Sequence, residues 1–216
     1  FPYTTLFRSQ YSSYSNVLIR DSQYKSAMFI LTHLQTLTAE VLKHTTSEIE
    51  KKNHIKNFFK VSFKENISKT KFDLSALLNL LQEFGNLPDI SEVKSQAILP
   101  YYVTFEAFLQ ITNNIAYIHA KKDKMEKAFY ILLTSMTCMF GLEYSSYYLK
   151  YHLSTMMLNL TYIFEPDNKD EANKLITNTI MMLEKLENKI DSLKNSTTIY
   201  NFLNNKSNKF AFLLEY

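Results

Sequence analysis

Glycine scarcity is the feature that most constrains how this chain can fold. Its 216 residues include two glycines, Gly85 and Gly141, where average usage would give about 15. Tight hairpins and sharp strand turns depend on glycine. Phosphate-binding loops such as G-x-G-x-x-G need several glycines at fixed spacing. The sequence therefore predicts an all-α fold and excludes the glycine-loop nucleotide sites.

Charge and cysteine content exclude further classes. The net charge is +3. Lysine supplies nearly all of the basic residues and alternates with acids instead of forming a stripe, so we expect no nucleic-acid partner. Cys138 is the single cysteine, which rules out a disulfide within the chain. No apolar run reaches the ~18 residues of a membrane span. We expect an intracellular, cytoplasmic protein.

The two ends of the sequence suggest a fragment. Residues 1–9, FPYTTLFRS, resemble a translated sequencing-library adapter, and we exclude them from fold reasoning as one would a cloning scar. The last residues, FLLEY, carry no helix-stop signal. We expect residues 10–216 to form one helical domain of a longer protein.

Apolar residues recur at helical spacing through most of the chain. In one stretch, Tyr24, Ala27, Met28, Leu31, Leu34 and Leu37 define a single apolar face. Similar patterns, with proline and glycine as start and stop signals, predict helices over about 22–43, 73–85, 100–121, 124–140, 143–164 and 169–193. Less regular patterns predict helices after 46, up to 98 and after 197. Short connections favour antiparallel pairs, arranged as a bundle or an α-solenoid.

An internal repeat favours the solenoid. Small residues stand twelve positions apart in one predicted pair of helices, which lets the two backbones approach closely. These are Ala116 and Ala128, followed by the large Leu132 and the small Ser135. A second copy begins with Asn159-Leu160-Thr161-Tyr162-Ile163 and continues with Ala172, Ile176 and Thr179. A partial copy at the front has Ser15, Leu18, Tyr24, Ala27 and Leu31.

These positions resemble the small-small-large-small pattern of the tetratricopeptide repeat (TPR), most closely over residues 109–142. Thr112, His119 and Gly141 stand where that family usually has Trp, Tyr and Pro. The long spacing is similar to the repeat variant of kinesin light chains. A weaker similarity, in Leu99-Pro100 and residues 140–144, is to the C-terminal helical region of SET-and-MYND methyltransferases. The resemblance implies stacked antiparallel helix pairs. Residues 44–100 fit no repeat, and a non-repeating helical bundle is the alternative.

The same resemblance implies a non-catalytic scaffold that binds a peptide or a partner helix in a concave groove. First helices of TPR pairs line that groove, so Asn113, Asn114, Tyr117 and Asn159 are candidate peptide contacts. Tyr148 and Tyr151 belong to a tyrosine cluster on the helix predicted over 143–164, and tyrosines offer rigid contact area with a polar tip. The alternatives are inter-helix hydrogen bonds for the asparagines and core packing for the tyrosines. The lysine-and-asparagine clamp of chaperone-binding repeats does not match.

Catalytic and metal-binding patterns do not emerge. The five histidines form neither H-x-x-x-H nor H-E-x-x-H, and Cys138 lies in an apolar context that favours an inert thiol. The acids Glu165, Asp167, Asp170 and Glu171 fit a negatively charged helix start. We therefore expect no metal, no cofactor and no enzyme activity. An alternative function is that of an accessory helical domain in a larger enzyme, such as a SET/MYND-type lysine methyltransferase.

Overall fold

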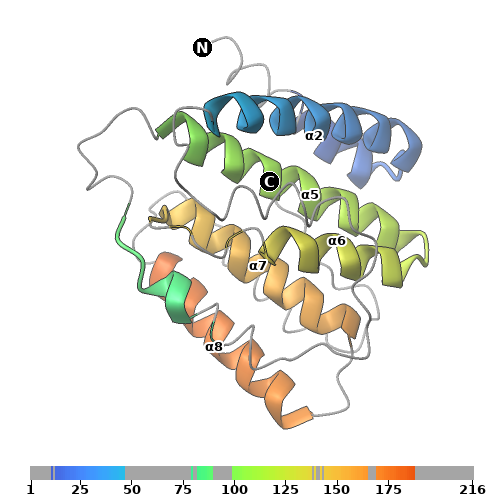
Figure 1. Ribbon diagram of the computed structural model, residues 1–216. Helices are drawn as coiled ribbons and strands as arrows, with labels where there is room; N and C mark the ends of the chain where they lie inside the picture. The colour runs from blue at the N-terminus through green and yellow to red at the C-terminus, as the bar shows by residue number, and fades with distance from the viewer. Residues whose placement is uncertain are drawn as a thin grey trace.

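Every regular element in the described part of the chain is an α-helix (Figure 1), which confirms the all-α prediction. The computed structural model describes residues 11, 13–46, 79, 82–89, 99–137, 139, 142, 144–164 and 169–187. Predictions for residues 1–9, for Cys138, for the acid cluster at 165–167, and for helices near 47–59, near 91–98 and after 197 lie outside the described residues.

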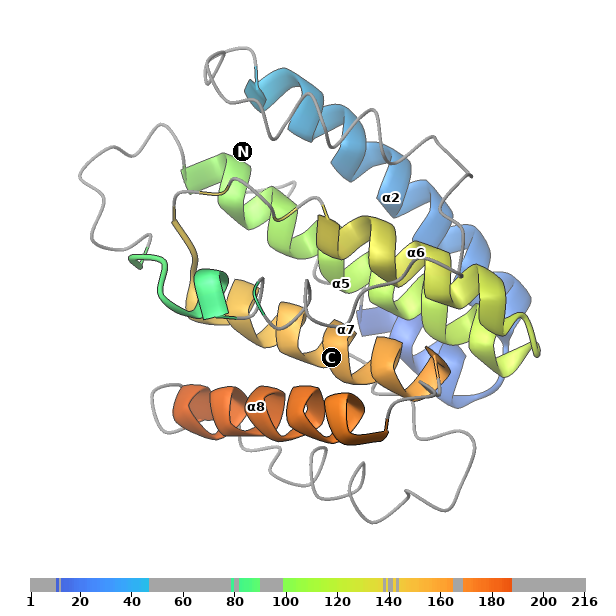
Figure 2. The same ribbon diagram turned by 60° about the horizontal axis from the view of Figure 1, so that its bottom comes forward.

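The helices follow one another in pairs. A first helical segment covers residues 13–20 and precedes α2 (Tyr24–Thr46). The second pair is α5 (Leu99–Lys121) and α6 (Met125–Thr137), and the third is α7 (Tyr147–Phe164) and α8 (Lys169–Glu187). Helix α2 packs against α5, α5 against α6, α6 against α7 and α7 against α8, and α5 also contacts α7. Figures 1 and 2 show these helices layered from α2 to α8.

The turns inside the first two pairs share one backbone geometry. Ser22 and Asp123 both adopt a left-handed conformation, with φ of 58° and 56°. The N–H of Ser22 donates to the carbonyl of Ile19 (3.0 Å), and the N–H of Gln23 donates to that of Leu18 (2.8 Å). This is the Schellman pattern that ends helices, normally built around glycine. The turn thus forms here without the residue that most easily adopts it.

Helix α7 begins later than the sequence predicted. Ser146 caps it, since its hydroxyl oxygen accepts a hydrogen bond from the N–H of Leu149 (3.0 Å). The preceding Ser145 pairs with Asp89 in an isolated bridge. The prediction of a helix from residue 143 was therefore wrong at its start. Helix α6 likewise ends at Thr137, before the expected 140.

Two apolar clusters join the helices. The smaller cluster includes Ala27, Leu31 and Ile118 and seats the first pair on α5. The larger one joins α5, α6, α7 and α8 and extends to Phe84. Tyr117 packs against both clusters and so links them. Burial of each large side chain in the two clusters contributes about 1.5–3 kcal/mol.

The buried stripe of α2 differs from the predicted one. Ala27, Leu31 and Leu34 are buried as expected, but Leu37 is 42% exposed and the neighbouring Thr38 is fully buried. Thr38 tolerates burial because its hydroxyl donates to carbonyls of its own helix, with that of Leu34 at 2.9 Å. The inward face of α2 therefore runs through a threonine.

Candidate functional site

The three asparagines expected to contact a peptide lie in the interior. Asn113, Asn114 and Asn159 each have 0% exposure. The side-chain amide of Asn159 donates to Oδ1 of Asn113 at 2.9 Å. Their burial argues against direct contact with a peptide. The structure shows the alternative, an inter-helix hydrogen bond.

A second hydrogen bond joins two further asparagine side chains. The amide nitrogen of Asn114 donates to Oδ1 of Asn16 at 2.8 Å, across 98 positions of sequence. Asn16 lies in the first helical segment, Asn114 on α5 and Asn159 on α7, so the two bonds join the leading helices of all three pairs. Buried amides need partners because an unsatisfied polar group is costly in the interior. These bonds fix how the pairs align along one another.

Two of the predicted tyrosines remain half-exposed. Tyr117 on α5 carries the Lys121 ammonium over its ring, 5.3 Å from the centroid. Tyr151 on α7 meets the ring of His152 edge-on, with centroids 5.9 Å apart. The side chain of Tyr148 lies outside the described residues. Tyr144, expected on the same helix, precedes α7 and donates its backbone N–H to the hydroxyl oxygen of Tyr102 (3.2 Å).

A polar cluster that the sequence analysis missed lies at the start of α7. The hydroxyl of Ser146 donates to the carboxyl group of Glu106 on α5. Burial raises the pKa of Glu106, the bond from Ser146 and the charge of His152 act in the opposite direction, and Asp89 raises it further. No spacing rule would have found this group, because its members come from three segments far apart in sequence.

The segment 85–89 is held against the same end of α7. The ammonium of Lys150 donates to the carbonyls of Gly85 (2.9 Å) and Leu87 (3.1 Å). The N–H of Ser145 donates to the carbonyl of Pro88 (3.0 Å). Each of these bonds joins two separate segments. We interpret the cluster as a clasp that holds α5, α7 and residues 85–89 together.

The described residues hold no group of three or more His, Cys, Asp or Glu side chains placed to bind a metal ion. Within the same part of the chain, none of the helices has the length and apolarity needed to cross a membrane. No protein-family model, curated protein or solved structure matches this chain significantly. Its function must therefore be argued from its own geometry.

Proposed function

We propose that this chain is a helical-repeat domain of TPR type that acts as a scaffold for a protein partner. The observation that carries the proposal is a repeated turn. The bonds that close the first turn recur 101 residues later. The N–H of Asp123 donates to the carbonyl of Ala120 (3.0 Å), and the N–H of Lys124 donates to the carbonyl of His119 (2.9 Å). Both helix pairs are thus joined by a turn of the same backbone geometry, as repetition of one unit would produce.

The small-residue positions support the same unit. Ser15 and Ala27 in the first pair, and Ala116 and Ala128 in the second, all have 0% exposure. Small side chains at these positions would let paired helices approach closely, and a larger side chain would separate the backbones. Leu132 fills the adjacent large position and is also fully buried.

The packing order is a further argument for stacking over a single bundle. Helix α6 packs on both α5 and α7, and α5 contacts α7 as well. In a stack of hairpins the second helix of one pair lies between its own partner and the first helix of the next. In the same way, α2, the second helix of the first pair, packs against α5, the first helix of the second pair.

The proposed contact surface is smaller than the sequence suggested. The asparagines are internal and the side chain of Tyr148 lies outside the described residues, which leaves Tyr117, with Lys121 beside its ring, and Tyr151. Both side chains are partly buried, and a tyrosine adds rigid contact area at little entropic cost. We propose that these two side chains contact an extended peptide or a partner helix.

Selection of peptides from a phage-displayed library on the whole chain tests the function. The enriched peptide is then labelled, and its affinity is measured by fluorescence anisotropy for wild type, for Tyr117→Ala and for Tyr151→Ala. Thr32→Ala, an exposed position on α2, is the control. We expect both tyrosine variants to bind at least about 5-fold more weakly, since interface tyrosines often cost more than 1 kcal/mol on truncation. Unchanged binding by both variants would refute the proposed surface.

A further inference from the structure

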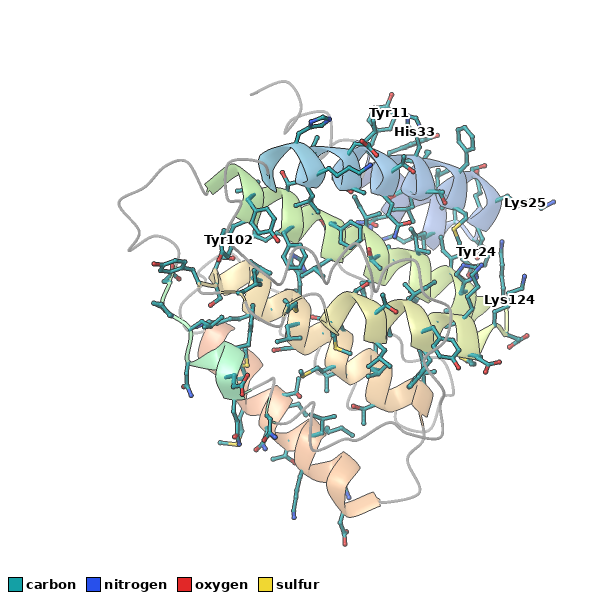
Figure 3. All side chains as sticks on the ribbon, in the orientation of Figure 1. Tyr11, Tyr24, Lys25, His33, Tyr102 and Lys124 are labelled. Carbon is teal, nitrogen blue, oxygen red and sulfur yellow. The ribbon has the colours of Figure 1, made fainter. Side chains whose placement is uncertain are left out.

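The turns of the first two helix pairs lie at the same end of the molecule, as Figures 1 and 2 show. Six basic side chains occupy this end, which we call the basic end: Arg20, Lys25, Lys121, Lys122, Lys124 and Lys127. Figure 3 labels Lys25 and Lys124 there, beside Tyr24. Three acids, Asp21, Asp123 and Glu126, share the region. The second turn alone has four lysines and two acids, and the first turn adds two basic residues and one acid to the same end.

The lysines of the second turn are not neutralised by these acids. Lys122, Lys124 and Lys127 are exposed, and within the described residues none of them forms an ion pair. The ion pair that the described residues do contain joins Lys43 to Glu40 (3.2 Å), near the far end of α2. The α5–α6 turn therefore presents three ammonium groups to solvent.

The pKa of His119 is affected by these lysines. His119 lies in the last turn of α5, and its Nδ1 is buried without a hydrogen-bond partner. Burial first, and then the charges of Lys127, Lys124 and Lys122, lower its pKa to about 4. Positive charges nearby disfavour the imidazolium form and so add to the effect of burial. An anionic ligand at these lysines would raise that pKa.

We propose that the basic end binds an acidic segment of a partner protein, with Lys122, Lys124 and Lys127 pairing with its carboxylates. Acids interspersed with the lysines and the near absence of arginine disfavour a nucleic acid, which is bound best by continuous, arginine-containing basic stripes. Lys121, which lies over the Tyr117 ring, adjoins both surfaces. Because Lys122, Lys124 and Lys127 are other residues than Tyr117 and Tyr151, their variants test the two proposals separately.

The test uses the whole chain and a short fluorescein-labelled peptide of alternating Glu and Ser, with a Gln-for-Glu peptide as its neutral counterpart. Fluorescence anisotropy at physiological ionic strength should detect binding of the acidic peptide and no binding of the neutral peptide. Combined replacement of the three lysines by glutamate should weaken it roughly 10-fold or more, because each exposed ion pair is worth a factor of up to about 5 in affinity. Bound peptide should also raise the pKa of His119, followed by NMR.

Lys43→Glu is the matched control for Lys124→Glu, since it makes the same charge change. Lys43 lies about 30 Å along α2 from the first turn, well beyond the Debye length of about 8 Å. We expect Lys124→Glu to weaken binding and Lys43→Glu to leave it unchanged. Equal effects of the two variants, no binding of the acidic peptide, or tighter binding of a single-stranded oligonucleotide of matched charge would each overturn the proposal.

Discussion

The bond between Asn113 and Asn159 offers the sharpest test of how the helix pairs are aligned. Both side chains are fully buried, and the amide of one donates to the carbonyl oxygen of the other at 2.9 Å. Replacement of either residue by alanine leaves a buried polar group of the other without this hydrogen-bond partner. We expect each single variant to lose about 1–3 kcal/mol of unfolding free energy. For a domain of this size, that loss lowers Tm by roughly 2–4 °C per kcal/mol.

The double variant separates the shared bond from the other interactions that each asparagine makes. Once both partners are gone, neither leaves the other unpaired, so the double variant should be less destabilised than the two single losses combined. A coupling energy of about 0.5–3 kcal/mol is typical of residues in direct contact. Because the two residues lie on α5 and α7, this energy measures one inter-pair contact.

Urea unfolding followed by far-UV circular dichroism provides the four free energies of the cycle. Asn178→Ala, an exposed position on α8, is the matched control and should change stability by no more than about 0.5 kcal/mol. Strict additivity of Asn113→Ala and Asn159→Ala would refute the bond as a link between the pairs. An unchanged m-value is required for the comparison.

Three further predictions concern turns, pH and the clasp. Ser22→Gly and Asp123→Gly should each stabilise the fold by about 0.5–1 kcal/mol, because glycine adopts the left-handed conformation without strain; Ser26→Gly, in regular helix, should destabilise it by a similar amount, and a loss at both turns would contradict the assigned geometry. The raised pKa of Glu106 means that the native state binds this proton more tightly than the unfolded state does. The contribution of Glu106 to stability is therefore fully present below about pH 4.5 and is lost as the pH rises through the folded pKa. The free energy of unfolding, measured across that pH range, should show this loss in wild type and not in Glu106→Gln. Lys150→Met removes both bonds to residues 85 and 87, and we expect a loss of about 1.5–3 kcal/mol together with faster proteolysis near residues 85–89; a cleavage rate equal to that of wild type would argue against the clasp.

The sequence predicted those parts of the fold that depend on neighbours within a few turns. Helix α5 was expected over 100–121 and lies over Leu99–Lys121, since its proline, periodicity and following turn are all local signals. Ala116 and Ala128 were expected at a helix contact, because small residues at that spacing allow two helices to approach closely. Both are fully buried. Scarcity of glycine disfavoured folds rich in tight turns, and the helical spacing of apolar residues supported the all-α class.

The tertiary structure decided which side chains of each helix face inward and which polar groups meet. Hydropathy favours Leu37 over Thr38, yet the face of α2 that meets α5 contains Thr38, whose hydroxyl is satisfied within its own helix. Likewise, an asparagine on a helix has the same local signal whether it faces a ligand or another asparagine; Asn16 lies 98 positions from its partner Asn114. Sequence by itself determined the helices because their hydrogen bonds and periodicity are local. Only the packed structure determined the buried hydrogen bonds between asparagine side chains and the Glu106–Ser146 clasp, because each depends on residues that packing brings together from distant parts of the chain. The lysines of the second turn are local in sequence, and packing adds the charges of the first turn to them.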